Sequence, residues 1–150
     1  MIDGLETEER GRSTEHWFVL FGALMIPVVI ALMAIWFTPD ERGFGTHEQL
    51  GIQPCITLEL WGVPCPGCGV TTSVTLAAQG KLLDSFLAQP LGFLLAIGGL
   101  LFTFWSLWLT LRGRDLYVTI MELPFAKLWR PLVLVVLVSW IYKWIRTVST

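Results

Sequence analysis

The stretch WFVLFGALMIPVVIALMAIWF, residues 17–37, decides the fold class because it contains no charged side chain. As an α-helix rising about 1.5 Å per residue, it would extend roughly 30 Å, the thickness of a bilayer's hydrocarbon core. Trp17 and Trp36 stand near its two ends, where aromatic side chains favour the membrane interface. Pro27 is tolerated inside a membrane helix. These features predict an uncleaved transmembrane helix over residues 17–37.

The composition of the whole chain agrees with a membrane protein. Hydrophobic residues make up 54% of the 150 residues and charged residues only 15%, whereas soluble domains carry about 25% charged residues. The net charge is -2, and the sequence has no Lys/Arg cluster dense enough to bind along a phosphate backbone. No nucleic-acid partner is therefore predicted. The predicted partners are the lipid bilayer and either other membrane protein subunits or further copies of this chain.

Two further stretches are long and apolar. Residues 91–111 are free of charge, and Gly98 and Gly99 offer a surface for close packing with a neighbouring helix. The third stretch, residues 131–148, is apolar up to Lys143 and spans the bilayer if Lys143 and Arg146 extend to the headgroups. The alternative for this stretch is a buried interfacial helix. The predicted fold is therefore an all-α integral membrane protein with two to three transmembrane helices.

The connecting segments are more polar, and their charges predict an orientation. Lys and Arg favour the cytoplasmic loops of membrane proteins, and segment 38–90 carries only Arg42 and Lys81. We therefore place the N-terminus in the cytoplasm and the cysteines outside it. Residues 1–16 form a polar cytoplasmic tail, residues 38–64 an extracytoplasmic loop, and residues 112–130 a cytoplasmic interfacial loop. Residues 65–90 contain the cysteine turn and two interfacial helices, over 70–79 and 81–89.

The sequence CPGCG at residues 65–69 is the most distinctive motif. Pro66 and Gly67 occupy the second and third positions of a predicted type II turn, in which Gly67 has a positive φ. Such a turn brings the two cysteine Cα atoms within about 7 Å, near the upper limit for a disulfide. Gly69 permits a backbone conformation that other residues resist, and a helix containing Thr71 follows. The motif therefore predicts a tight turn that initiates a helix.

Four interpretations of the cysteines remain open. Cys65 and Cys68 form half of a zinc site, which Cys55 and His47, or a second chain, would complete to four ligands. They share the spacing of a thioredoxin dithiol, although Pro and Gly stand in the opposite order. They fit a structural disulfide, either Cys65–Cys68 or one to Cys55, if the loop is extracytoplasmic. Finally, they fit reduced, packed cysteines at a helix start. Zinc is the one cofactor that these interpretations contain.

The segment from the cysteine motif into residues 91–111 resembles an uncharacterised family of small bacterial membrane proteins, domain of unknown function 2752. That family shares Cys-Pro-x-Cys-Gly-x-Thr-Arg, a short helix, a Gly, and an Asn-Pro-like step into a transmembrane helix. Two positions depart from it, with Thr72 in place of Arg and Gln89 in place of Asn. The resemblance implies a bacterial cytoplasmic (inner) membrane protein without assigning an activity. The matching residues are Cys65, Pro66, Cys68, Gly69, Thr71, Gly80 and Pro90.

Other residues give no catalytic pattern. The sequence contains no nucleophile–base constellation, no phosphate-binding Gly loop and no paired carboxylates on a shared helix face. We therefore predict no catalytic residue, and an enzyme is the weaker class. His16 is predicted to be a solvated histidine at the interface. The primary hypothesis is a structural or accessory subunit of a membrane assembly. The alternative is a thiol/disulfide or zinc module acting through Cys65 and Cys68.

Overall fold

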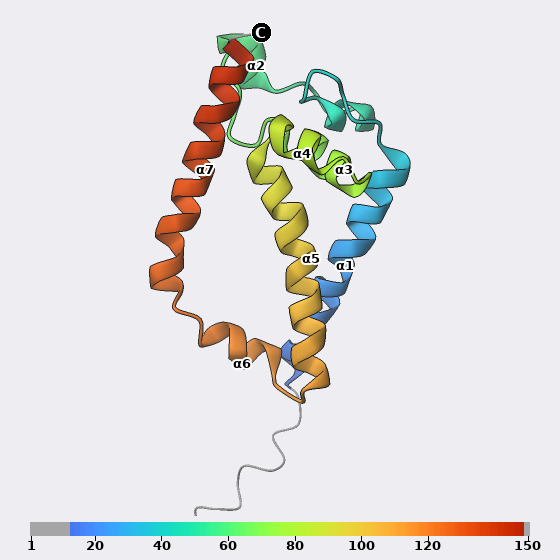
Figure 1. Cartoon of the computed structure of the whole chain (residues 1–150), viewed down its shortest axis with the longest axis vertical. Coiled ribbons are helices and arrows are strands. Elements are labelled where there is room, and N and C mark those ends of the chain that lie inside the picture. Colours follow the sequence, from blue (N-terminus) through green and yellow to red (C-terminus); the bar gives the residue numbers. More distant parts are fainter. Residues whose placement is uncertain (1–12, 149–150) are drawn as a thin grey trace, which may run out of the picture.

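The structure is a computed structural model that describes residues 13–148. Within that range all regular elements are helical, so the predicted all-α fold is confirmed (Figure 1). Most of the predicted polar tail lies outside the described residues. The elements are α1 (Thr14–Trp36), the 3₁₀ helix η1 (Thr46–Leu50), α2 (Ile56–Trp61), α3 (Val70–Ala78), α4 (Leu82–Ala88), α5 (Pro90–Leu111), α6 (Leu116–Met121) and α7 (Phe125–Val148).

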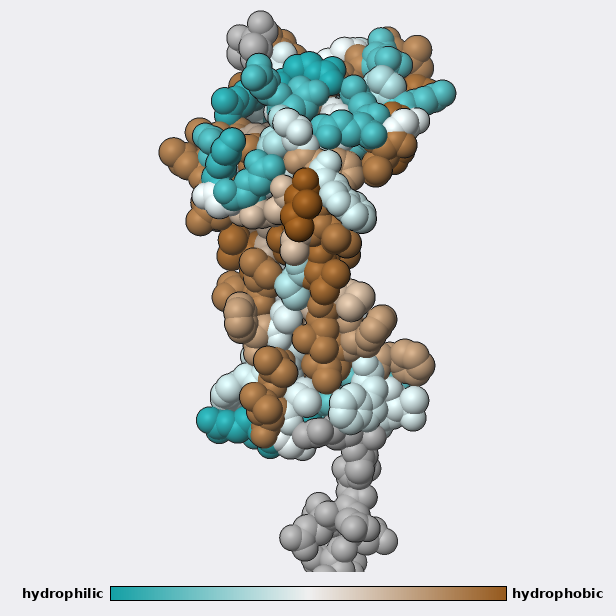
Figure 2. Space-filling model, turned by 90° about the vertical axis from the view of Figure 1, so that its right-hand side faces the viewer, coloured by the Kyte–Doolittle hydropathy of each residue, from teal (hydrophilic) through white to brown (hydrophobic). Residues whose placement is uncertain are grey.

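Three of these helices, α1, α5 and α7, are long and apolar enough to cross a membrane, and they make the chain a membrane protein. On the face shown in Figure 2, hydrophobic side chains cover most of the middle of the molecule, and hydrophilic side chains gather toward its ends. The third helix begins at Phe125, earlier than the predicted start at residue 131. The Leu128 N–H donates to Pro124 O at 3.2 Å, so the helix starts directly after Pro124. Pro131 lies inside it, as membrane helices allow.

Helices α1 and α5 run side by side and pack closely (Figure 1). A Cβ added to Gly99 would lie 2.9 Å from Ile26 Cγ2, so only glycine permits this approach. Thr103 Oγ1 also donates to Ala23 O at 2.7 Å, across the two helices. The predicted packing role holds for Gly99 alone, because a Cβ on Gly98 would meet nothing within 4 Å.

Histidine 16 lies at the start of α1 and is fully buried, so the prediction of a solvated interfacial histidine is wrong. The reason is that α6 folds back over the start of α1, where Leu20, Leu109 and Leu116 form a hydrophobic cluster. The Leu116 N–H donates to His16 Nδ1 at 2.9 Å. The accepting Nδ1 places the ring proton on Nε2 in the neutral tautomer. Thus His16 joins α1 to α6.

We expect His16→Ala to lower the free energy of unfolding by about 1–3 kcal/mol, because it leaves the buried Leu116 N–H without an acceptor. His16→Asn should recover part of this loss, since the Asn side-chain oxygen is an acceptor at a similar reach. Reversible unfolding in mixed detergent micelles measures both changes. Glu15→Ala, at an exposed neighbouring position, is the control. Equal effects of His16→Ala and Glu15→Ala would contradict this role.

Helices η1, α3 and α4 form a layer over one end of α1 and α5, with α3 and α4 lying across it, whereas α6 lies at the other end (Figure 1). Helix α3 crosses α5 so closely that a Cβ on Gly92 would lie 2.7 Å from Ser73 Cβ. Ser73 and Ser85 are both fully buried, and Ser85 Oγ donates to Ser73 O at 2.7 Å. These contacts fix α3 and α4 against the start of α5. The cysteine motif directly precedes α3 and so belongs to this layer.

Candidate functional site

The cysteine turn differs from the predicted type II turn. The Cys68 N–H donates to Cys65 O at 2.9 Å, which closes the turn as expected. However, Gly67 does not have a positive φ. The Val70 N–H donates to Gly67 O at 3.1 Å, so a second turn follows directly and winds into α3. The central residues of this second turn are Cys68 and Gly69, and a type II turn needs a positive φ at its third residue. The left-handed residue is Gly69 instead, with φ 89°.

Gly69 also lies where three segments meet. A Cβ at this position would be 2.5 Å from Gly43 O and 3.1 Å from Lys143 Nζ. The first of these is a backbone atom of the loop before η1, and the second belongs to α7. The predicted turn residue Gly69 therefore has two requirements that only glycine meets, a positive φ and a close approach.

Cys55 lies beside the motif, although it comes ten positions before Cys65 in the sequence. It precedes α2, and its Sγ lies 3.1 Å from Thr57 Oγ1. Partial burial opposes ionisation of this thiol, but hydrogen bonds from Thr57, from the backbone N–H groups of Cys65 and Leu58, and from the Cys65 thiol outweigh it. The pKa of Cys55 is lowered to about 6. Cys55 is therefore mostly a thiolate at neutral pH.

The other two thiols are shifted in the opposite direction. Burial, followed by the neighbouring Cys55, raises the pKa of Cys65. Cys68 is only 4% exposed, and burial together with the charges of Cys55 and Cys65 raises its pKa to about 12. The three cysteines thus form one interacting group, the cysteine cluster, which holds its negative charge on Cys55.

Side chains from outside the motif hold the cysteine cluster in place. Gln89 Nε2 donates to Pro66 O at 3.2 Å from the start of α5. Trp140 Nε1 donates to Pro64 O at 2.8 Å from α7. Lys143, one turn further along α7, donates to Gly43 O at 2.9 Å. Sequence reasoning missed this role of α7, because no local pattern links Trp140 or Lys143 to the turn.

The remaining predicted site residues occupy ordinary structural positions. Thr71 lies in the first turn of α3, where its carbonyl accepts a hydrogen bond from Thr75 Oγ1 at 2.9 Å. Thr72 is fully buried, and its Oγ1 lies 2.7 Å from Thr46 Oγ1. Gly80 has a φ of 79° just after α3, and Pro90 is the first residue of α5.

The zinc and disulfide interpretations stay predictions. Within residues 13–148, no three His, Cys, Asp or Glu side chains are arranged to hold a metal ion. His47, in η1, accordingly does not join two of the cysteines in such a set. Cys55, Cys65 and Cys68 are free thiols in this structure.

One of three comparisons with known proteins gave a match. Residues 55–103 match the family model described as Protein of unknown function (DUF2752), so the predicted resemblance to this family is confirmed. The match begins at Cys55 and ends within α5, and therefore contains the cysteine cluster but neither α1 nor α7. Neither the curated proteins nor the solved structures gave a match.

Proposed function

We propose that this membrane protein exchanges thiols and disulfides at the membrane surface, with Cys55 as the attacking thiolate and Cys65 as its resolving partner. The observation that supports it best is the low pKa of Cys55, whose Sγ lies 3.1 Å from Thr57 Oγ1 and whose thiolate is also stabilised by Cys65. The thiolate is the nucleophile in disulfide exchange, and a thiol with a pKa near the ambient pH reacts fastest. The buried Cys68 thiol is a poorer nucleophile because its pKa is raised to about 12.

The exchange would proceed in two displacements. The Cys55 thiolate attacks one sulfur of a partner disulfide, forms a mixed disulfide and releases the partner's other sulfur as a thiolate. Cys65 then loses its proton and attacks Cys55 Sγ, which releases the partner's second thiolate. Two electrons pass from the Cys55–Cys65 pair to the partner, whose two sulfurs take up the proton of Cys65 and one proton from the solvent. The chain is left with a Cys55–Cys65 disulfide.

The proposed location is a bacterial inner membrane, with the N-terminus in the cytoplasm and the cysteine cluster outside. The basic residues of segment 112–130 support this orientation. Lys143 and Arg146 lie on the cysteine side and weaken the charge bias, but both donate to backbone carbonyls of the protein. Disulfides persist outside the cytoplasm, so partner disulfides would be available there.

The test uses the reduced full-length protein in detergent and a small aromatic disulfide as the probe. We expect two equivalents of aromatic thiol to be released and a Cys55–Cys65 disulfide to form. Chymotryptic cleavage at Trp61, between the two cysteines, allows mass spectrometry to identify this disulfide. Cys65→Ser should stop at a mixed disulfide on Cys55, whereas the control Cys68→Ala should still form the intramolecular disulfide. A mixed disulfide on Cys65 or Cys68 in the unmodified protein, or no intramolecular disulfide, would refute the proposal.

A second candidate is the structural or accessory subunit, and a cleft between α5 and α7 favours it. The cleft has a volume of about 610 Å³ and an entirely apolar lining, which suits a helix of another membrane subunit. Its lining residues are Leu91, Leu94, Leu95, Phe125, Leu128, Trp129, Pro131, Leu132 and Val135.

Purification in a mild detergent separates the two candidates. Another membrane protein that co-purifies with the chain, and does so equally after Cys→Ser substitution, would support the accessory role. A solitary monomer would refute that role, and a homo-oligomer would identify a second copy as the occupant of the cleft.

A further inference from the structure

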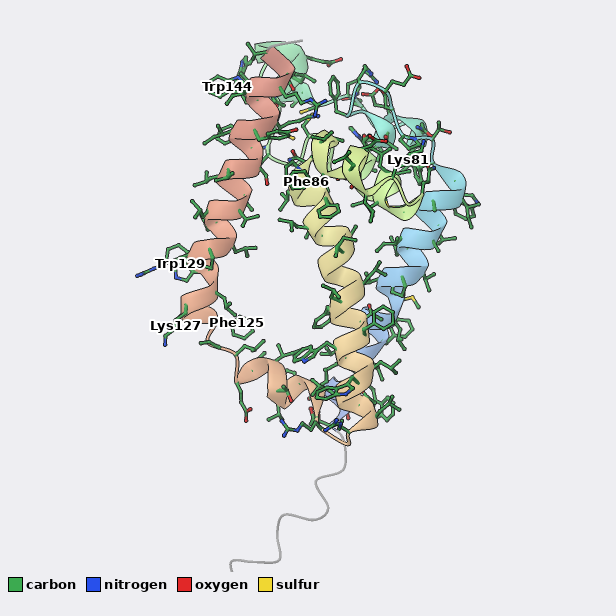
Figure 3. The ribbon with its side chains drawn as sticks, in the orientation of Figure 1. Lys81, Phe86, Phe125, Lys127, Trp129 and Trp144 are labelled. Atoms are coloured by element: carbon green, nitrogen blue, oxygen red, sulfur yellow. The ribbon has the colours of Figure 1, made fainter. Side chains whose placement is uncertain are left out.

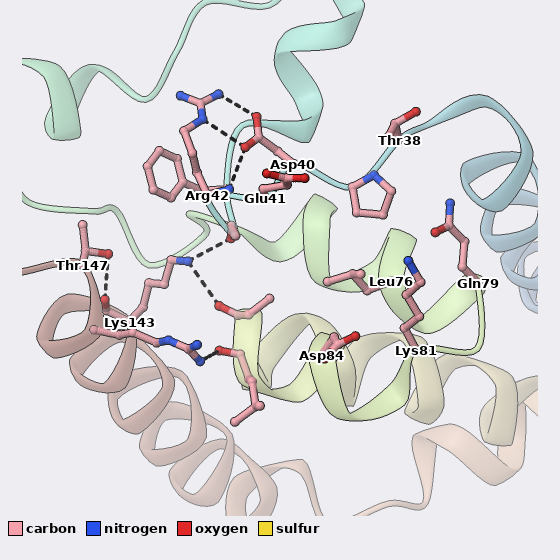
Figure 4. A pocket seen from close by; sticks show the side chains of 16 residues that line it. Thr38, Asp40, Glu41, Arg42, Leu76, Gln79, Lys81, Asp84, Lys143 and Thr147 are labelled. Atoms are coloured by element: carbon pink, nitrogen blue, oxygen red, sulfur yellow. Dashed lines mark hydrogen bonds and ion pairs between the residues drawn. The ribbon is translucent and has the colours of Figure 1, made fainter. Parts of the chain in front are cut away.

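A second hollow, with polar side chains, lies on the cysteine side of the molecule, between the loop that follows α1, the α3–α4 pair and the last turns of α7 (Figure 4). Its volume is about 840 Å³. Four basic side chains line it, from three separate segments: Arg42, Lys81, Lys143 and Arg146. The acidic side chains of the lining are Asp40, Glu41 and Asp84.

Arg42 and Asp40 neutralise each other at the rim. Arg42 Nη2 lies 2.7 Å from Asp40 Oδ2 and 3.0 Å from Glu48 Oε2. The Arg42 guanidinium holds the pKa of Asp40 below its usual range, so this pair stays ionised at neutral pH. Arg42 is thus shared between two carboxylates, Asp40 and Glu48. The other basic side chains of the lining are Lys81, Lys143 and Arg146, and its other carboxylates are Glu41 and Asp84.

Lys143 is a nearly buried cation at the side of this hollow. It is 4% exposed, and its Nζ donates to Gly43 O at 2.9 Å and to Ala88 O at 3.2 Å. Its Nζ also lies 5.4 Å from the centre of the Phe44 ring. Within residues 13–148, no carboxylate forms an ion pair with it. An ammonium group has three N–H donors, and a buried charge is costly without a counter-charge.

We propose that this hollow, the Lys143 pocket, binds a phosphate group, carried by an anionic phospholipid headgroup or by a soluble phosphate compound. An anionic oxygen beside Lys143 Nζ would accept its third N–H and supply the missing counter-charge. Lys81, opposite Lys143 across the pocket (Figure 4), would attract the same anion electrostatically. No cysteine lines the pocket, although Lys143 also acts electrostatically on the neighbouring Cys68.

The surroundings of the pocket place it at a bilayer interface, where a phospholipid headgroup would lie. Leu83 is 71% and Ile145 is 60% exposed, and both belong to helices that border the pocket. Phe86 and Trp144 lie at the same end of the molecule as Lys81 (Figure 3). Basic residues next to membrane helices attract the negatively charged headgroups of anionic lipids.

The test measures binding to the full-length protein in neutral detergent, with phosphatidylglycerol, phosphatidylcholine and inorganic phosphate as probes. We expect phosphatidylglycerol to raise the unfolding temperature more than phosphatidylcholine does. Lys143→Met should weaken its binding by about tenfold, the loss typical of one hydrogen bond to a charged group. Lys81→Gln, at an exposed position, should weaken it in the same direction and keeps the test valid if Lys143→Met does not fold.

Lys127→Gln is the matched control, because it removes the same charge at the far end of α7, where Lys127 points away from α5 (Figure 3). Stabilisation by inorganic phosphate, lost in Lys81→Gln, would support the soluble source. Stabilisation by phosphatidylglycerol without an effect of inorganic phosphate would support the lipid source. No stabilisation by either probe, or equal weakening by Lys127→Gln and Lys81→Gln, would overturn the proposal.

Discussion

Gly69→Ala is expected to destabilise the protein by about 3 kcal/mol or more, the largest structural effect of any substitution considered. Alanine at φ 89° carries a backbone strain of about 1–3 kcal/mol. The added Cβ would also lie 2.5 Å from Gly43 O, a backbone atom that cannot rotate away. The loop that contains Gly43 would have to move away from α3, and the hydrogen bond from Lys143 Nζ to Gly43 O would be lost with it. Reversible unfolding in mixed micelles measures the change in free energy.

Gly80→Ala separates the two causes. Gly80 also has a positive φ, 79°, but its added Cβ would meet nothing within 4 Å. Gly80→Ala should therefore lower the free energy of unfolding only by the backbone strain, about 1–3 kcal/mol. A loss for Gly69→Ala no larger than that for Gly80→Ala would mean that the approach of Gly43 to the cysteine turn is not tight.

The second large effect is on thiol reactivity. We expect Cys55→Ser to remove the fast-reacting thiol, leaving Cys65 and Cys68 to react only at alkaline pH. The pKa of Cys55 is lowered to about 6, so its thiolate is present above pH 6 and is lost as the pH falls below it. An ordinary thiol, with a pKa of about 8.5, is only about 1% thiolate at pH 6.5. The larger thiolate fraction of Cys55 raises its reaction rate, but the thiolate of an acidic thiol is less nucleophilic. The net result is that Cys55 should react about tenfold faster than an ordinary thiol at this pH.

The measurement is the rate of iodoacetamide alkylation at each cysteine between pH 5 and 9, by peptide mass spectrometry. The Cys55 rate should rise with a midpoint near pH 6 and level off above pH 7. Thr57→Val should move this midpoint upward, because it removes the hydroxyl 3.1 Å from Cys55 Sγ. A midpoint above pH 8 for Cys55 in the unmodified protein would show that the cysteine cluster does not stabilise its thiolate.

The membrane helices could be predicted because their formation depends on local composition. An uninterrupted apolar stretch of the right length enters a bilayer as a helix whatever its neighbours are, and α1 and α5 occur where they were expected. At the start of α1, Ser13 Oγ accepts from the His16 N–H as an N-cap side chain does, which is again a local preference. The start of α7 was predicted wrongly. The prediction placed Pro131 as the first residue of the helix, but Pro131 lies inside a helix that begins at Phe125.

The cysteine site was predictable only in part. The motif indicated a turn before a helix, which Cys65 and Cys68 form. It did not indicate that Gly69, rather than Gly67, takes the positive φ, because that choice depends on how the turn joins α3. Nor did spacing single out Cys55, whose low pKa arises from donors in α2 and in the motif.

By itself, the sequence determined that the chain is helical, that it enters a membrane and that two cysteines lie in a turn. These properties follow from transfer free energies and local backbone preferences, which act over a few turns of chain. Only the tertiary structure decided that His16 is buried, that Cys55 carries the charge of the cysteine cluster, and that Lys143 of α7 lies against Gly69. Those properties depend on atoms a few ångströms apart that belong to distant segments, because hydrogen bonds and desolvation act only at short range.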